Sequence, residues 1–136
     1  MNIYDQLKRD EGSKNFPYTD TVGKLTIGVG RNLTDRGISE DELETLLLND
    51  VKIATGQLAG ALPWYAALDE ARRGVLLNMA FNMGISGLLG FHRALSFMEN
   101  GEYDKAADEI LASKWAVQVG ARASRLATQL RSGEWQ

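Results

Sequence analysis

Apolar and polar positions follow the period of an α-helix at the N-terminus. Ile3 and Leu7 stand four residues apart, and the next position on their stripe is Glu11. Asn2 supplies an N-cap, and Gly12 ends the helix directly after the glutamate. The pattern therefore predicts an N-terminal helix whose apolar stripe ends in a carboxylate.

A second pattern, in residues 24–30, alternates with the period of a β-strand. Thr26 is the only hydroxyl on the face opposite the apolar side chains, and two glycines leave that face nearly bare. Residues 15–19 can pair with this strand, which places Asp20 in an exposed connecting turn. The sequence thus predicts a β-hairpin with a carboxylate in its turn and a hydroxyl on its open face.

Helical periodicity governs the rest of the chain. A capping box at Ser39–Glu42 opens a long helix that ends near Gly56 or Gly60. The most apolar helix, at residues 74–83, is apolar almost all round, so we expect it at the buried centre of a helical lobe. Shorter helices broken by glycine, asparagine or serine follow. These elements predict an α+β fold.

Glu11 and Asp20 are the candidate chemical groups. Partial burial and the negative end of the helix dipole disfavour the ionised form of Glu11, whereas Asp20 in an exposed turn stays ionised. An acid and a carboxylate in different ionisation states form the pair that cleaves glycosidic bonds. A plainer interpretation also fits these residues: a solvated helix end and an ordinary turn aspartate.

Composition narrows the function classes. A chain of 136 residues makes one folding unit of ordinary size, and its net charge of −3 argues against nucleic acid as the principal partner. There is no cysteine, and the single His92 has no companions that would bind a metal with it. No signal-peptide h-region and no apolar run of about 20 residues is present, so we expect no stable membrane insertion and folding in a cytosol.

Several motifs together resemble a known family. Its catalytic signature is matched in type and spacing, and its later landmarks follow in the same order. The chain is similar to the T-even phage lysozyme family, glycoside hydrolase family 24. The matching segments are Glu11-Gly12, Tyr18–Thr21, Gly23, Thr26–Gly30, Asp69–Arg73, Asn78–Gly84, Gly90-Phe91, Ser113–Trp115 and Gly133–Trp135.

The resemblance implies a lysozyme-like two-lobe fold with a cleft between the lobes. A small lobe, about residues 12–58, contains the β-hairpin and the long connecting helix. The helical large lobe takes residues 59–136 together with the N-terminal helix 1–11. The segment between Asn32 and Ile38 is shorter than in the best-known members, so the small lobe should be reduced.

The implied activity is hydrolysis of the β-1,4 bond between N-acetylmuramic acid and N-acetylglucosamine in bacterial peptidoglycan. Glu11 would protonate the leaving oxygen, while Asp20 and Thr26 position the attacking water. The family is inverting, which would place the two carboxyl groups roughly 6.5–9.5 Å apart. No metal or cofactor is implied.

Other site residues come from the resemblance alone. It implies that Arg122 reaches the catalytic glutamate and that Asn82 supports the cleft wall, although Asn82 also fits a satisfied core amide. Arg31 replaces a histidine of several members and is expected to pair with Asp50. The family's sugar-contacting positions correspond here to Asn32, Phe81, Ala94 and Glu109, of which only Phe81 keeps the residue type.

The resemblance also implies a cellular role. A phage product of this family waits in the host cytoplasm until a separate pore-forming protein breaches the membrane, and then acts on the cell wall as a monomer. Two alternatives remain open on the sequence. One is a lytic transglycosylase, which uses one acid and no water. The other is a non-catalytic sugar-binding module.

Overall fold

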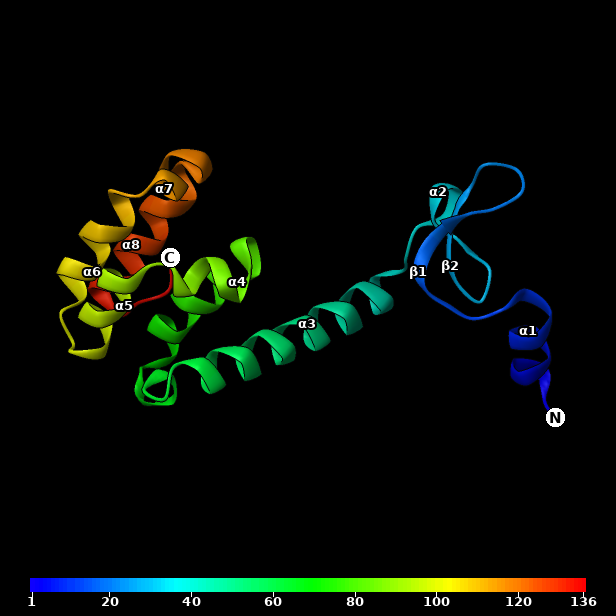
Figure 1. The fold of residues 1–136 in the computed structure, drawn as a ribbon, viewed down its shortest axis with the longest axis horizontal. Helices are drawn as coiled ribbons and strands as arrows, with labels where there is room; N and C mark the ends of the chain where they lie inside the picture. The colour runs from blue at the N-terminus through cyan, green and yellow to red at the C-terminus, as the bar shows by residue number, and fades with distance from the viewer. The chain divides into compact units, whose positions relative to one another are not determined.

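The computed structural model describes all residues, 1–136, and divides them into two compact units, Met1–Leu47 and Leu48–Gln136. Helices dominate, and a three-stranded antiparallel sheet lies in the first unit, so the predicted α+β fold is confirmed (Figure 1). The predicted lobe boundaries stay predictions. The helices are α1 Ile3–Glu11, α2 Leu33–Arg36, α3 Glu40–Ala61, α4 Glu70–Leu89, α5 His92–Glu99, α6 Tyr103–Leu111, α7 Lys114–Val119 and α8 Ala121–Ser132; the strands are β1 Lys14–Thr19, β2 Leu25–Gly28 and β3 Arg31–Asn32.

Both ends of α1 follow the sequence signals. The side chain of Asn2 accepts a hydrogen bond from the backbone N–H of Asp5 at 3.0 Å. Gly12 adopts a φ of +81° and donates its N–H to the carbonyl of Lys8, a backbone conformation that favours glycine. Glu11 is therefore the last residue of the helix, as predicted.

The sheet has the order β1-β2-β3, with β2 in the centre. Thr26 of β2 pairs with Tyr18 on one side and with Asn32 on the other. The predicted hairpin is β1 and β2, whereas β3 was not predicted. A two-residue strand is too short to show a period of two. The turn that precedes it is marked by two glycines with positive φ, Gly28 at +67° and Gly30 at +71°.

The predicted capping box opens α3. The hydroxyl of Ser39 accepts from the backbone N–H of Glu42 at 3.2 Å, and the Glu42 carboxylate accepts from the backbone N–H of Ser39 at 2.9 Å. The helix then continues through Gly56 and Gly60, one residue beyond the predicted end. Burial of Leu58, which is fully shielded from solvent, offsets the low helix propensity of these glycines.

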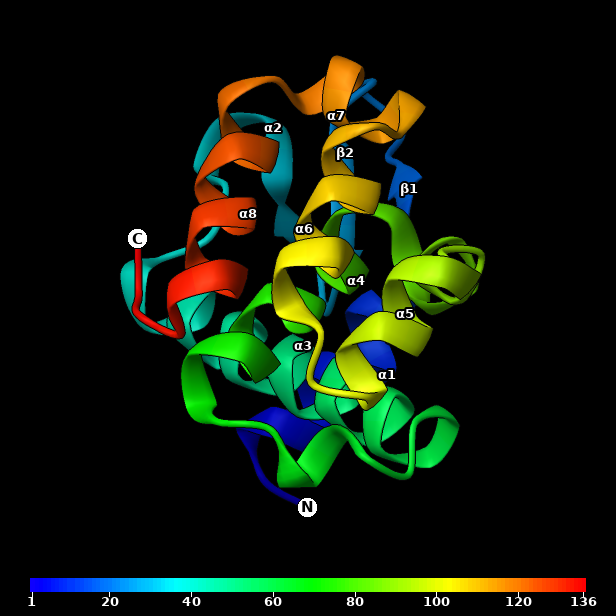
Figure 2. The same ribbon diagram turned by 90° about the vertical axis from the view of Figure 1, so that its left-hand side faces the viewer.

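The core of the second unit surrounds α4. Its side chains Val75, Leu76 and Met79 are each at most 1% exposed, as the apolar pattern predicts. Gly84 interrupts the helical geometry with φ +79° and ψ 162°, and a second helical segment continues to Leu89. Figure 2 shows α6 lying between α5 and α8, with which it packs. No single helix is both long enough and apolar enough to cross a bilayer.

Candidate active site

The carboxylate of Glu11 lies over the turn between β2 and β3. A Cβ atom added at Gly30 would stand 3.2 Å from Glu11 Oε2 and 3.6 Å from its carboxyl carbon. The glycine thus leaves the room that the glutamate occupies. The sequence predicted a bare glycine face that another group could approach, but not that Glu11 is that group. Glu11 is exposed within its unit, which does not supply the partial burial expected for it.

Asp20 is held by one of its two carboxylate oxygens. Oδ1 accepts from the backbone N–H groups of Val22 at 2.9 Å and Lys24 at 2.8 Å. Oδ2 accepts no hydrogen bond from the protein. The turn therefore orients the carboxylate and leaves its second oxygen able to accept a proton or a hydrogen bond from a water molecule.

Thr26 is only 4% exposed, whereas the sequence predicted an open strand face. It lies on the central strand β2, between Tyr18 of β1 and Asn32 of β3. Its hydroxyl donates to the carbonyl of Lys24 at 3.0 Å. That oxygen has a single proton, so toward a water molecule Thr26 acts as an acceptor.

The carbonyl of Lys24 joins the two predicted water-positioning residues. It accepts from the Asp20 backbone N–H at 2.9 Å and from the Thr26 hydroxyl at 3.0 Å. Asp20 and Thr26 are therefore fixed to one peptide group at the turn end of the hairpin.

Of the six residues predicted to contact sugar or support the cleft, only Asn32 shares this unit. There it caps α2, accepting from the Asp35 N–H at 3.0 Å.

Polar side chains of the second unit link α4 to the last two helices. The side-chain oxygen of Asn82 accepts from the indole N–H of Trp115 at 2.8 Å. Arg122 donates to the side-chain oxygen of Asn78 at 2.9 Å and to its carbonyl at 3.2 Å. Asn82 thus has a hydrogen-bond partner, but it is exposed and so is not a core amide. The roles of Asn82 and Arg122 at a catalytic cleft stay predictions.

Two predicted sugar-contacting positions lie together on the second unit. Ala94 and Glu109 line one surface hollow of about 580 Å³. Ala94 is 3% exposed, and Glu109 is paired with Arg93 at 3.1 Å. Phe81 lies elsewhere on α4 with 46% of its surface exposed.

No group of three or more His, Cys, Asp or Glu side chains that could hold a metal ion occurs in the structure.

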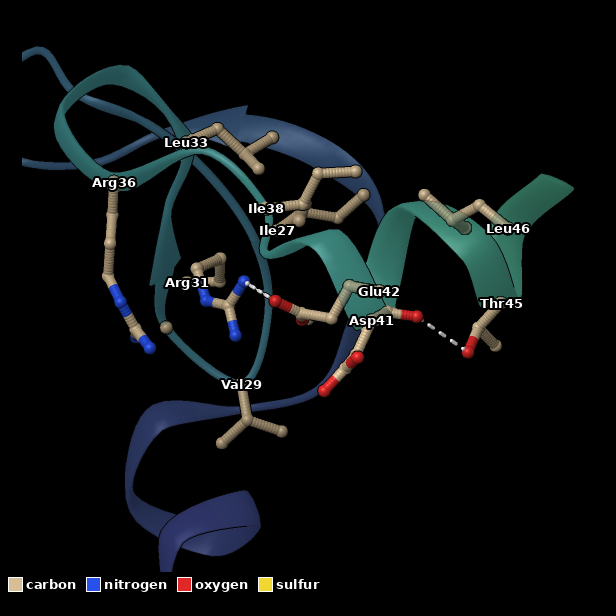
Figure 3. Close-up of a pocket in the computed structure, with 12 residues that line it drawn as sticks. Ile27, Val29, Arg31, Leu33, Arg36, Ile38, Asp41, Glu42, Thr45 and Leu46 are labelled. Atoms are coloured by element: carbon tan, nitrogen blue, oxygen red, sulfur yellow. Dashed lines mark hydrogen bonds and ion pairs between the residues drawn. The ribbon is translucent and has the colours of Figure 1, made fainter.

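Arg31 forms an ion pair with Glu42, at 2.7 Å between Nη1 and Oε1 (Figure 3). This differs from the expected partner, Asp50, which lies eight residues further along α3 and belongs to the other unit. The hydrogen bond from Arg31, followed by those from Ser39, lowers the pKa of Glu42 to about 2. The same pair raises the pKa of Arg31. Glu42 was not predicted as the partner of Arg31, because the capping box already accounted for its carboxylate.

The Arg31–Glu42 pair should make the stability of the fold depend on pH in the acidic range. Glu42 has a pKa of 4.5 in the absence of its partners and about 2 in the folded protein. A lowered pKa stabilises the fold above pH 4.5 and loses this effect as the pH falls toward 2. We expect Glu42→Gln, which keeps an acceptor for the Ser39 N–H, to lower Tm at pH 7 but not at pH 2. Equal losses of Tm at both pH values would show that the pair contributes nothing.

Gly30 should be needed to position Glu11. A methyl group at Gly30 would crowd the Glu11 carboxyl at 3.2 Å and also meet a φ of +71°. We expect Gly30→Ala to lower the rate of peptidoglycan clearing about tenfold or more and to destabilise the fold by about 1 kcal/mol. Gly37→Ala is the matched control because Gly37 has a φ of +61° and open space around it. Similar loss of activity in both variants would assign the effect to backbone strain.

Comparison with known proteins identifies the family. The family model described as phage lysozyme matches residues 8–134. "Probable T4-type lysozyme 1" of Dictyostelium discoideum is 29% identical over 161 aligned positions, covering 97% of this chain and 95% of that protein. These matches place the chain among the lysozymes, glycosidases that degrade peptidoglycan. The chain belongs to the phage lysozyme family.

A second kind of relative carries the same region within a larger protein. The "Pre-baseplate central spike protein Gp5" of Enterobacteria phage T4 is 30% identical over 163 positions, which cover 98% of this chain and 28% of that protein. Both alignments are longer than the 136 residues of this chain, so the relatives contain segments that it lacks. The predicted reduction of the small lobe stays a prediction.

Proposed function

We propose that this lysozyme hydrolyses the β-1,4 bond between N-acetylmuramic acid and N-acetylglucosamine. The observation that supports this most directly is the shared carbonyl of Lys24, which accepts from both the Asp20 N–H and the Thr26 hydroxyl. Each then offers an acceptor to one water molecule, Asp20 through Oδ2 and Thr26 through Oγ1. Glu11, at the end of α1, is the second carboxyl group of the same unit.

The reaction we propose is a single displacement. Glu11 gives its proton to the glycosidic oxygen as the bond from that oxygen to the anomeric carbon breaks. The water held by Asp20 and Thr26 forms the new bond to that carbon from the opposite face and passes a proton to Asp20. Inversion results, and the two carboxyl groups should lie roughly 6.5–9.5 Å apart across the bound sugar.

Three residues of the second unit and one of the first are proposed to hold the sugar chain. Phe81 is the best supported, because its exposed ring offers an apolar face to a pyranose. We propose Asn32, Ala94 and Glu109 as weaker contacts, since their side chains are engaged in α2, buried or paired with Arg93. Arg122 and Asn82 would support this surface through α4.

Product analysis tests the reaction. Purified peptidoglycan is digested, and the fragments are examined by mass spectrometry and by NMR of the newly formed anomeric centre. We expect reducing muramic acid ends that carry one added water and appear first as the α-anomer. Anhydro ends would instead identify a lytic transglycosylase, and first-formed β-anomers would require Asp20 to act as a covalent nucleophile. Absence of released fragments would favour a sugar-binding module.

We also propose that the protein waits in the host cytoplasm until the membrane is breached. Membership of the phage lysozyme family supports this. Expression in a Gram-negative host tests it. Lysis should begin only after a membrane-permeabilising agent is added, whereas lysis without the agent would contradict the proposal.

A further inference from the structure

The peptide group between Lys24 and Leu25 is held at both of its polar ends. Its carbonyl accepts from the Asp20 N–H at 2.9 Å and from the Thr26 hydroxyl at 3.0 Å. Its N–H, which belongs to Leu25, donates to Oγ1 of Thr34 at 2.8 Å. The carbonyl and the N–H of a trans peptide point in opposite directions, so one faces the hairpin turn and the other faces α2. The proposed water-positioning groups and Thr34 therefore share one planar unit.

The hydroxyl of Thr34 takes the place of a missing strand partner. β3 contains only Arg31 and Asn32, which pair with the middle of β2. Beyond Asn32 the chain turns into α2, which begins at Leu33, so the strand gives the Leu25 N–H no carbonyl to bind. A backbone N–H in a sheet needs an acceptor, and the second residue of α2 supplies one from its side chain. The ladder of hydrogen bonds is thus extended by one side-chain oxygen.

Two contacts attach α2 to this place, and they can be removed separately. The helix packs against β2 and β3 (Figure 1). Besides the hydrogen bond of Thr34, the carboxylate of Asp35 pairs with Nζ of Lys24 at 3.2 Å. The two side chains of this ion pair are 39% and 56% exposed, and surface pairs of this kind contribute little to stability. Of the two contacts, only the one from Thr34 reaches the main chain.

We propose that Thr34 is a positioning residue for the hydrolysis. It orients the Lys24–Leu25 peptide group, and through that group it orients Asp20 and Thr26, the two acceptors of the attacking water. The inference rests on the proposed function, because this water is the nucleophile of that reaction. The hydrogen bond fixes the plane of the peptide group. It also polarises the amide, since an N–H that donates makes its own carbonyl a stronger acceptor.

Rates of hydrolysis of soluble, uncrosslinked peptidoglycan by two variants test the proposal. Valine has nearly the shape of threonine but cannot accept from the Leu25 N–H, whereas serine keeps the hydroxyl. We expect Thr34→Val to lower kcat about fivefold, the size that loss of one hydrogen bond between neutral groups gives. KM should stay unchanged, because the water and not the sugar loses its support. Thr34→Ser should restore most of the wild-type kcat.

Two control variants separate this contact from general damage. Thr45→Val makes the same replacement at an exposed hydroxyl of α3, which donates to the Asp41 carbonyl at 3.0 Å. Asp35→Asn removes the ion pair of α2 with Lys24 and leaves the peptide contact in place. Both variants should keep kcat within about twofold of wild type. An equal loss of kcat in Asp35→Asn and Thr34→Val would assign the effect to a loosened α2 and overturn the proposal.

Further outcomes separate this inference from the proposed function. An unchanged kcat in Thr34→Val, a raised KM in its place, or failure of Thr34→Ser to restore kcat would overturn the role of Thr34 while hydrolysis stands. Failure of the wild-type protein to cleave peptidoglycan would overturn the proposed function instead. Thermal unfolding shows whether Thr34→Val is folded during the assay, and if it is not, Thr34→Ala replaces it with the same expected loss. Hydrogen exchange at the Leu25 amide should be slower in wild type than in the folded variant, and equal exchange would contradict the contact.

Discussion

Replacing Glu11 with glutamine should lower the rate of peptidoglycan hydrolysis about a thousandfold, because glutamine cannot supply the proton that the leaving oxygen needs. The substitution keeps the size of the side chain over Gly30. Glu11 is exposed and forms no ion pair, so the free energy of unfolding should change by less than about 0.5 kcal/mol. Initial rates of clearing and a thermal unfolding curve measure both quantities.

A matched variant makes the Glu11 result specific. Glu44→Gln removes another exposed glutamate of the first unit that has no ion pair, and we expect it to retain the wild-type rate. Equal activity of wild type and Glu11→Gln would mean that a different group is the acid. Binding of the glycan by Glu11→Gln with unchanged affinity would confirm that the loss lies in the chemical step.

Replacing Asp20 with asparagine should have the second largest effect, a loss of activity of about 10²–10⁴-fold. Asparagine can keep its side-chain oxygen where Oδ1 accepts from Val22 and Lys24, so the turn survives. What disappears is the free acceptor Oδ2, which becomes an N–H₂ donor and cannot take a proton from the water. The measurement is again the initial rate, with stability followed by thermal unfolding.

Asp20→Ala serves as the structural comparison. It removes the two hydrogen bonds of the turn as well as the free oxygen, so it should also destabilise the protein by about 1–3 kcal/mol. If Asp20→Asn retained full activity while Asp20→Ala lost both activity and stability, Asp20 would be a turn residue and the proposed base would be wrong.

The elements that were predicted correctly depend on local chemistry. The caps at Asn2 and Gly12 and the capping box at Ser39 involve residues within four positions of one another. A sequence window contains everything that determines them. The hairpin is equally local, because its two strands are joined by the short turn at Asp20.

The features that were missed depend on contacts between distant positions. The position of Glu11 over Gly30 joins residues 19 apart, and the pair of Arg31 with Glu42 joins residues 11 apart. Thr26 is buried although its strand predicted an open face, and β3, which pairs with it, has no pattern of its own. Periodicity finds faces and caps, but it does not show which side chains meet when the faces are folded together.

The shared carbonyl of Lys24 has a consequence for which residues position 24 can accept. Both groups that it holds, the Asp20 N–H and the Thr26 hydroxyl, are fixed by a main-chain atom, and the Lys24 N–H in turn holds Asp20 Oδ1. The side chain at this position points to Asp35 and takes no part. We therefore expect position 24 of this chain to tolerate most substitutions, and proline, which has no N–H, to be the exception.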